Sequence, residues 1–63
     1  MGFNEKVKIA RKRLMLSQED MAKELGVTFA TLNRWENKKN EPNYEAQRAF
    51  AVFCKKHGIE FKE

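Results

Sequence analysis

Residues 17–37 read SQEDMAKELGVTFATLNRWEN, and this stretch decides the fold because it predicts two short helices joined by a glycine. Ser17 opens the first helix, over roughly residues 18–25, because it begins a capping box in which Asp20 replaces the usual Glu. Gly26 follows the last apolar residue at once, where helices commonly end on a residue with positive φ. The stretch therefore predicts a helix, a tight turn and a second helix.

The second helix of this pair is expected to follow Thr28, which suits an N-cap, and to have two faces. Leu32 and Trp35 lie on its inner face, with Thr28 or Thr31 beside them. Positions 30, 33, 34 and 37 recur at helical spacing and form one outward stripe. The alternative is an ordinary solvated face, under which an exposed Phe29 is unusual, although single exposed apolar residues need no explanation. The outward residues are Phe29, Ala30, Asn33, Arg34 and Asn37.

A helix is also predicted before the pair, over roughly residues 4–14, because apolar residues recur there at helical spacing. Basic residues occupy most of the gaps, so this helix has one apolar and one charged face. Its apolar stripe consists of Phe3, Val7, Ala10 and Leu14, with Ile9 beside it.

A last helix follows Pro42, with Asn43 as its N-cap and Gly58 as the residue that ends it. The tail, residues 59–63, alternates apolar and polar residues like a short strand. The chain is therefore expected to be one all-α domain, residues 1–63, with four compact helices and a short C-terminal tail. The core face of the last helix consists of Ala46, Ala49, Phe50 and Phe53, with His57 at its end.

The composition fits a small basic domain with a polyanionic partner. The chain has 63 residues and a net charge of +4, and a basic balance favours nucleic acid. With Cys54 as the only cysteine, no intrachain disulfide can form, which favours a reducing cytoplasm. Neither a signal-peptide core nor an apolar run of about 20 residues is present, so we expect a cytoplasmic protein away from membranes.

Catalysis is not expected from this sequence. No set of nucleophile, base and orienting group appears, and only a pair of Cys54 and His57 would offer catalytic chemistry. One Cys and one His cannot supply the four ligands of a structural zinc site. We therefore expect no catalytic residues, no metal, no cofactor and no small-molecule effector.

Two segments resemble the phage-repressor/Cro-type helix-turn-helix regulators. Leu16–Val27, LSQEDMAKELGV, is similar to their LSQEELAxxLGV segment, and Trp35–Pro42, WENKKNEP, is similar to their WENGKxxP segment. The spacing between the segments also matches, and the resemblance covers roughly residues 7–53. It implies a lambda-repressor-like DNA-binding domain whose third helix enters the major groove of DNA.

The resemblance also implies which residues touch DNA. Gln18 should contact a phosphate at a helix N-terminus, where backbone amides attract anions. The planar fork of Arg34 matches guanine, Asn33 suits adenine, and apolar residues meet thymine methyl groups. Lys38 and Lys39 should hold phosphates, with a merely solubilising loop as the alternative. The full set expected at DNA is Gln18, Thr28, Phe29, Ala30, Asn33, Arg34, Asn37, Lys38 and Lys39.

Arg11 and Glu36 match a family pair that forms an internal salt bridge between the first and third helices. Neither is therefore expected to contact DNA or to act in catalysis. Met15 and Lys38 stand where the family often has Gly, which puts the two turns there in question. The chain ends six residues after His57, where many relatives have a fifth helix that is often used for dimerisation.

The sequence thus predicts sequence-specific binding of double-stranded DNA by a small transcriptional regulator, a repressor in the first instance. The alternatives are a protein-interaction module, an antitoxin-like partner, or the DNA-binding domain of a larger regulator. A homodimer is expected because one recognition helix reads only a few base pairs. Its candidate interface is the end of the last helix with Ile59 and Phe61, unless these two residues simply cover their own core.

Overall fold

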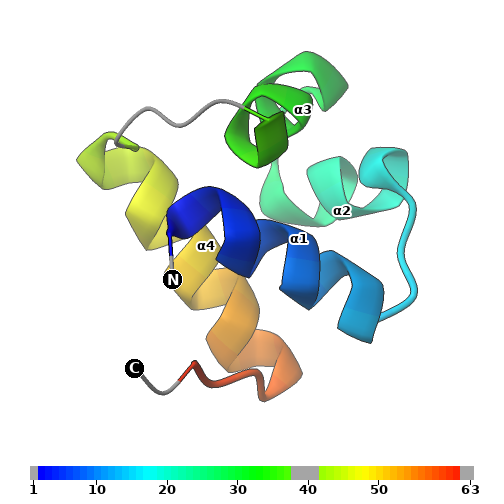
Figure 1. The fold of residues 1–63 in the computed structure, drawn as a ribbon, viewed down its shortest axis with the longest axis vertical. Helices are drawn as coiled ribbons and strands as arrows, with labels where there is room; N and C mark the ends of the chain where they lie inside the picture. Colours follow the sequence, from blue (N-terminus) through cyan, green and yellow to red (C-terminus); the bar gives the residue numbers. More distant parts are fainter. Residues whose placement is uncertain (1, 38–41, 62–63) are drawn as a thin grey trace.

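The computed structural model describes residues 2–37 and 42–61, which form four α-helices and no strand. The helices are α1 Phe3–Arg13, α2 Gln18–Leu25, α3 Phe29–Asn37 and α4 Tyr44–His57. In Figure 1, α3 lies at the top of the view above α1 and α2, and α4 runs down beside α1. The predicted all-α, four-helix architecture is confirmed, and no helix in these residues is long and apolar enough to cross a membrane.

The helices begin where short polar side chains cap them. The Ser17 hydroxyl accepts a hydrogen bond from the Asp20 amide at 3.0 Å, and Thr28 Oγ1 accepts one from the Thr31 amide at 3.1 Å. The Asn43 side chain accepts one from the Ala46 amide at 2.8 Å. Each bond satisfies a backbone donor that the first turn of a helix leaves without an intrahelical partner.

The three helices α1, α2 and α4 end in the same way. In each, a left-handed residue turns the chain, and the next amide reaches back five residues, which is a Schellman ending. Glycine holds the left-handed position after α2 and α4, with φ of 76° at Gly26 and 69° at Gly58. After α1 the position belongs to Met15, with φ of 57°, and the Leu16 amide donates to the Arg11 carbonyl at 3.1 Å. The turn therefore keeps the glycine-type conformation without glycine.

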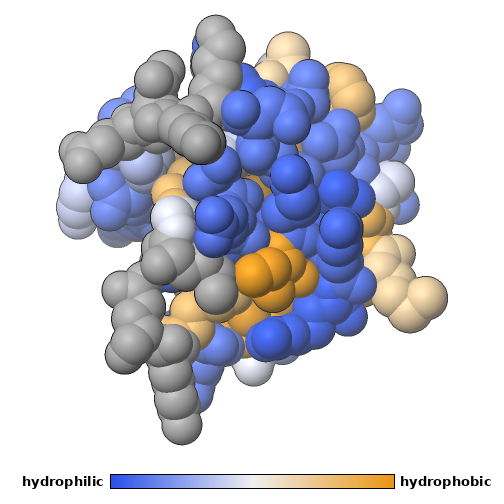
Figure 2. All heavy atoms as spheres, in the orientation of Figure 1, coloured by the Kyte–Doolittle hydropathy of each residue, from blue (hydrophilic) through white to orange (hydrophobic). Residues whose placement is uncertain are grey.

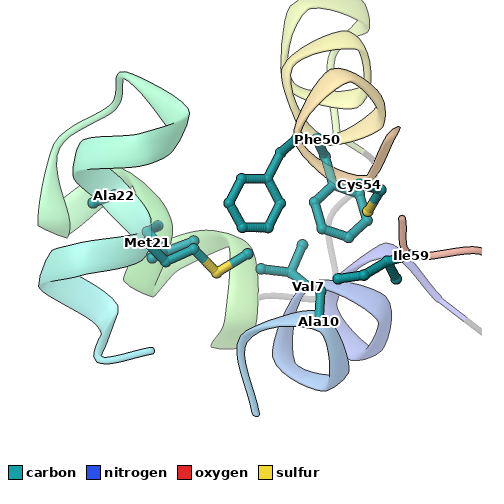
Figure 3. Packing of buried hydrophobic residues seen from close by; sticks show 9 residues of the cluster. Val7, Ala10, Met21, Ala22, Phe50, Cys54 and Ile59 are labelled. Atoms are coloured by element: carbon teal, nitrogen blue, oxygen red, sulfur yellow. The ribbon is translucent and has the colours of Figure 1, made fainter. Parts of the chain in front are cut away.

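One small core lies between the helices and the tail. Figure 3 shows that Met21, Phe50 and Ile59 point toward Val7 from three different segments. Val7, Met21 and Leu32 are fully buried, and hydrophilic side chains cover most of the face seen in Figure 2. The buried cluster consists of Val7, Ala10, Met21, Ala22, Leu32, Phe50, Phe53, Cys54 and Ile59.

Cys54 is part of this core. Burial raises the pKa of its thiol above the ordinary value, and the nearby charge of Lys6 opposes that shift. Because the thiolate is the reactive form of cysteine, a raised pKa makes this thiol a poor nucleophile. Cys54 is therefore a small buried residue of the core.

The described part of the tail, residues 59–61, does not form the strand that its alternation predicts. Within the described residues 59–61, the Ile59 amide donates to the Cys54 carbonyl at 2.8 Å, and Ile59 is buried. Phe61 packs near the Phe50 ring, with 6.1 Å between ring centroids. The left-handed turn at Gly58 directs these side chains back onto their own core, which in so small a domain requires apolar cover.

Met15→Gly is predicted to stabilise the protein by up to about 1 kcal/mol. A residue with a Cβ loses about 1–2 kcal/mol in the left-handed conformation, and glycine returns about 0.5–1 kcal/mol of that through its freedom in the unfolded chain. The Met15 side chain is 90% exposed, so its removal sacrifices little packing. Urea unfolding measures the change. Met15→Val is the matched control and should lower stability, and a Met15→Gly protein less stable than the parent would contradict the strain argument.

Candidate nucleic-acid interface

The outer face of α3 is exposed along its whole length. Phe29 at its first turn is 49% exposed, while Leu32 on the opposite side is fully buried. Trp35 is half-buried, and its ring meets that of Phe3 edge to face, with 5.4 Å between centroids. The predicted division of this helix into an inner and an outer face is confirmed. The exposed residues are Phe29, Ala30, Asn33, Arg34 and Asn37.

A salt bridge fixes α3 to α1. Arg11 Nε donates to Glu36 Oε2 at 2.9 Å and Arg11 Nη2 donates to Glu36 Oε1 at 3.1 Å, so the pair is bidentate. The Glu36 side chain is 2% exposed and that of Arg11 is 21% exposed. Arg11 Nη1 also donates to the Leu16 carbonyl at 3.3 Å, which ties the turn after α1 to the same group. These are the residues that the family resemblance pairs, and their contact leaves neither side chain free for DNA.

Three amide side chains form a network between the outer face of α3 and the start of α2. Asn37 Nδ2 donates to the Asn33 backbone carbonyl at 3.0 Å and to Asn33 Oδ1 at 2.6 Å. A carbonyl oxygen can only accept a hydrogen bond, so Asn37 donates from its NH₂ group. The side-chain atom of Asn33 that accepts from it is therefore the oxygen. Gln18 Nε2 donates to the same Oδ1 across a long distance of 3.5 Å.

This network changes what Asn33 offers to a base. Pairing with adenine needs the Asn33 oxygen to accept from the adenine N6 amino group. Asn37 engages one lone pair of that oxygen at 2.6 Å, and Gln18 Nε2 lies at the margin of hydrogen-bond distance from it, whereas Asn33 Nδ2 remains to donate. An adenine that pairs with Asn33 would therefore compete with Asn37 for this oxygen. Sequence reasoning missed the network, and its only local signal was the spacing of Asn33 and Asn37, one helical turn apart.

Of the remaining residues expected at DNA, two lie within the described part of the chain, at the starts of α3 and α2, and two lie outside it. Thr28 caps α3, and its hydroxyl also donates to Thr31 Oγ1 at 2.9 Å, so both of its hydrogen-bonding functions serve the helix start. Gln18 stands at the first position of α2, where backbone amides favour an anion. Lys38 and Lys39 lie outside the described residues.

Comparisons with known proteins agree with this arrangement. The helix-turn-helix family model matches residues 7–58. The chain is 36% identical over 53 residues to an HTH-type transcriptional activator, BcrR, of Enterococcus faecalis. The match covers 84% of this chain but 26% of that protein, so the chain spans about a quarter of the relative's length. No solved structure matches the chain.

The two partners of the α1–α3 salt bridge are predicted to differ in their cost of removal. Arg11→Ala leaves the buried Glu36 carboxylate without its partner and should cost about 3–5 kcal/mol of stability. Glu36→Ala leaves a guanidinium that is partly exposed and still bonded to the Leu16 carbonyl, so about 1–3 kcal/mol is expected. Chemical unfolding of both variants measures the difference, and equal losses, or none, would contradict the arrangement.

Proposed function

The chain belongs to the helix-turn-helix family, and on that premise we propose that it binds specific double-stranded DNA and regulates transcription. One observation supports this most: α3 presents an exposed outer face while the Arg11–Glu36 bridge holds its inner side to α1. A major groove about 12 Å wide admits an α-helix, and a helix fixed to its scaffold presents its side chains to the bases in one register.

Base reading is assigned to the outer face of α3. Arg34 offers a planar fork of donors that matches the N7 and O6 acceptors of guanine. Phe29 and Ala30 suit contact with a thymine methyl group. Asn33 contributes donors through Nδ2 while its oxygen is engaged, so we propose that it favours an acceptor such as guanine N7 or thymine O4 over bidentate adenine.

Phosphate contacts are assigned to the residues around α3. Gln18 and the α2 N-terminus are proposed to hold one phosphate, with Asn37, Lys38 and Lys39 beside another, and Thr28 supporting from the α3 cap. These contacts orient the domain and carry no sequence information by themselves. The proposed activity is binding, without a catalytic step.

The proposed regulator acts as a homodimer on a site with two half-sites. One recognition helix distinguishes too few base pairs for a genome, and two-fold dimers read half-sites about 34–36 Å apart. Repression is the proposed sign of regulation and rests on the resemblance to phage repressors, whereas activation is the role named for the Enterococcus faecalis relative. A cytoplasmic location is part of the same proposal.

A salt-dependent titration tests this function directly. Fluorescence anisotropy of labelled duplexes, first selected from a random pool, should show binding that weakens steeply between about 50 and 200 mM salt, as is typical of several phosphate contacts. A recovered sequence motif supports base reading. Absence of duplex binding at low salt would contradict the proposal and favour a protein-interaction module.

Arg34→Ala is predicted to lose affinity for the selected site by about 1–3 kcal/mol and to flatten base preference at one position. The reason is that a single guanidinium contributes a bidentate contact to one base pair. Competition with duplexes that vary at each position measures the effect. An equal loss for every sequence would assign Arg34 to a phosphate instead.

Lys38→Ala and Lys39→Ala are predicted to weaken binding to all sequences alike. Each substitution removes one phosphate contact and should reduce the slope of log affinity against log salt by about 1. The selected motif should stay the same. A slope equal to that of the parent protein in both variants would show that these two lysines only add solubility.

A further inference from the structure

The outer side of α4 carries a row of residues that the helix-turn-helix pair does not use. A groove of about 440 Å³ lies between α2 and α4, with Leu25 on one wall. Val52 stands at its edge and is 61% exposed, although it is a branched apolar residue. We define the α4 seam as Glu45, Ala49, Val52 and Lys56, which line this groove together with Arg48 and Phe53 of the same helix.

One side-chain contact joins the two walls of the groove. His57 Nε2 lies 2.9 Å from Glu24 Oε1, which joins the end of α4 to α2. The ring of His57 also packs on that of Phe53, with 4.6 Å between centroids. Glu24 and Phe53 both line the groove, and the contact between His57 and Glu24 links its α4 side to its α2 side.

The spacing of the α4 seam is that of a helix-pairing surface. Its members are separated by four, three and four residues, the alternation that keeps one face of a helix against a partner helix. Ala49, near the middle, is small enough to admit a neighbouring side chain. Glu45 and Lys56 lie in the first and last turns of α4, about 16 Å apart along its axis.

The charges select the partner and its direction. If two copies pack their seams antiparallel, a two-fold axis near residues 50 and 51 brings Glu45 of each copy to Lys56 of the other. The same axis brings Ala49 of each copy to Val52 of the other, so a branched side chain meets a small one. Parallel packing would instead place Glu45 against Glu45 and Lys56 against Lys56, which is repulsive. For Glu45 and Lys56 the antiparallel orientation is therefore the complementary one. Arg48, which lines the same groove, would lie opposite Phe53 of the other copy in that orientation.

We propose that the α4 seam binds a second copy of this chain through an antiparallel, isologous contact. This deepens the proposed function, because it supplies the surface on which a DNA-bound homodimer would form. The seam shares no residue with the proposed DNA face on α3 and the α2 N-terminus. It also replaces the interface expected at Ile59 and Phe61, which pack on their own core.

The contact should be weak in free solution. Four residues on one helix offer far less area than the roughly 1,200–2,000 Å² that stable complexes bury. Two half-sites on one duplex hold two copies close together and so raise their effective concentration. The dimer is accordingly expected at high protein concentration, or at low concentration on a palindromic duplex.

Charge reversal on the full chain tests the proposal. Glu45→Lys and Lys56→Glu each replace two symmetric attractions with two repulsions, and each should raise the dimer dissociation constant about tenfold at low salt. The double variant Glu45→Lys/Lys56→Glu should restore the parent value. Lys55→Glu, a neighbouring charge outside the seam, is the matched control and should have a much smaller effect. Sedimentation with and without a palindromic duplex measures all five proteins.

Several outcomes would overturn the proposal: a double variant as weak as the single ones, a control that behaves like Lys56→Glu, or a protein that stays monomeric on the palindrome. Thermal unfolding checks that each variant folds. If a charge variant does not fold, Val52→Ser in the α4 seam takes its place and should also weaken the dimer. Binding to a duplex with one half-site distinguishes the two proposals. If the parent protein does not bind this duplex, DNA binding is contradicted, while sedimentation without DNA still tests the seam.

Discussion

The salt bridge between Arg11 and Glu36 is the interaction on which the rest of the structure depends. A carboxylate buried to this degree is costly unless it is paired and hydrogen-bonded, and the guanidinium fork meets both of its oxygens. The pair joins α1 to the last turn of α3 across 25 residues of sequence. It thereby sets the orientation of α3 and holds the turn after α1 through the Leu16 carbonyl.

Apolar packing then stabilises α3 in the orientation that the salt bridge sets. Phe3 contacts Trp35 on one side and Phe50 on the other, each with 5.4 Å between ring centroids, so α1 connects α3 to α4. Ile59 covers the core from the tail. With so few buried residues, the inner face of α3 is needed to complete the core, and its outer face remains for a partner. The residues that hold α3 to the core are thus different from the residues on its exposed outer face.

The sequence predicts those parts of the fold that local rules determine. Caps at Ser17 and Asn43 and helix ends at Gly26 and Gly58 follow from the chemistry of single residues and are confirmed. The strand predicted for the tail is wrong for the described residues 59–61, because alternation cannot reveal that Gly58 turns Ile59 and Phe61 onto the core. The turn at Met15 was in doubt because its left-handed conformation is imposed by the turn rather than preferred by the residue.

The candidate site was predictable to the level of a helix face. Helical spacing identified the outer residues of α3, but it carries no information about how Gln18, Asn33 and Asn37 share hydrogen bonds. The pairing of Arg11 with Glu36 came from family resemblance, because residues so distant in sequence leave no periodic signal. The α4 seam was overlooked because its charges fit an ordinary exposed helix face until the groove beside it is seen.

The central claim is that the outer face of α3 contacts DNA, and nuclear magnetic resonance tests it most directly. The uniformly ¹⁵N-labelled protein is titrated with a selected duplex, and the shift of each backbone and side-chain amide is followed. If the outer face of α3 contacts DNA, the largest shifts are expected at the α3 residues Phe29, Ala30, Asn33 and Arg34 and at the side chain of Gln18. Large shifts confined to the outer faces of α1 and α4, with α3 signals unmoved, would contradict it.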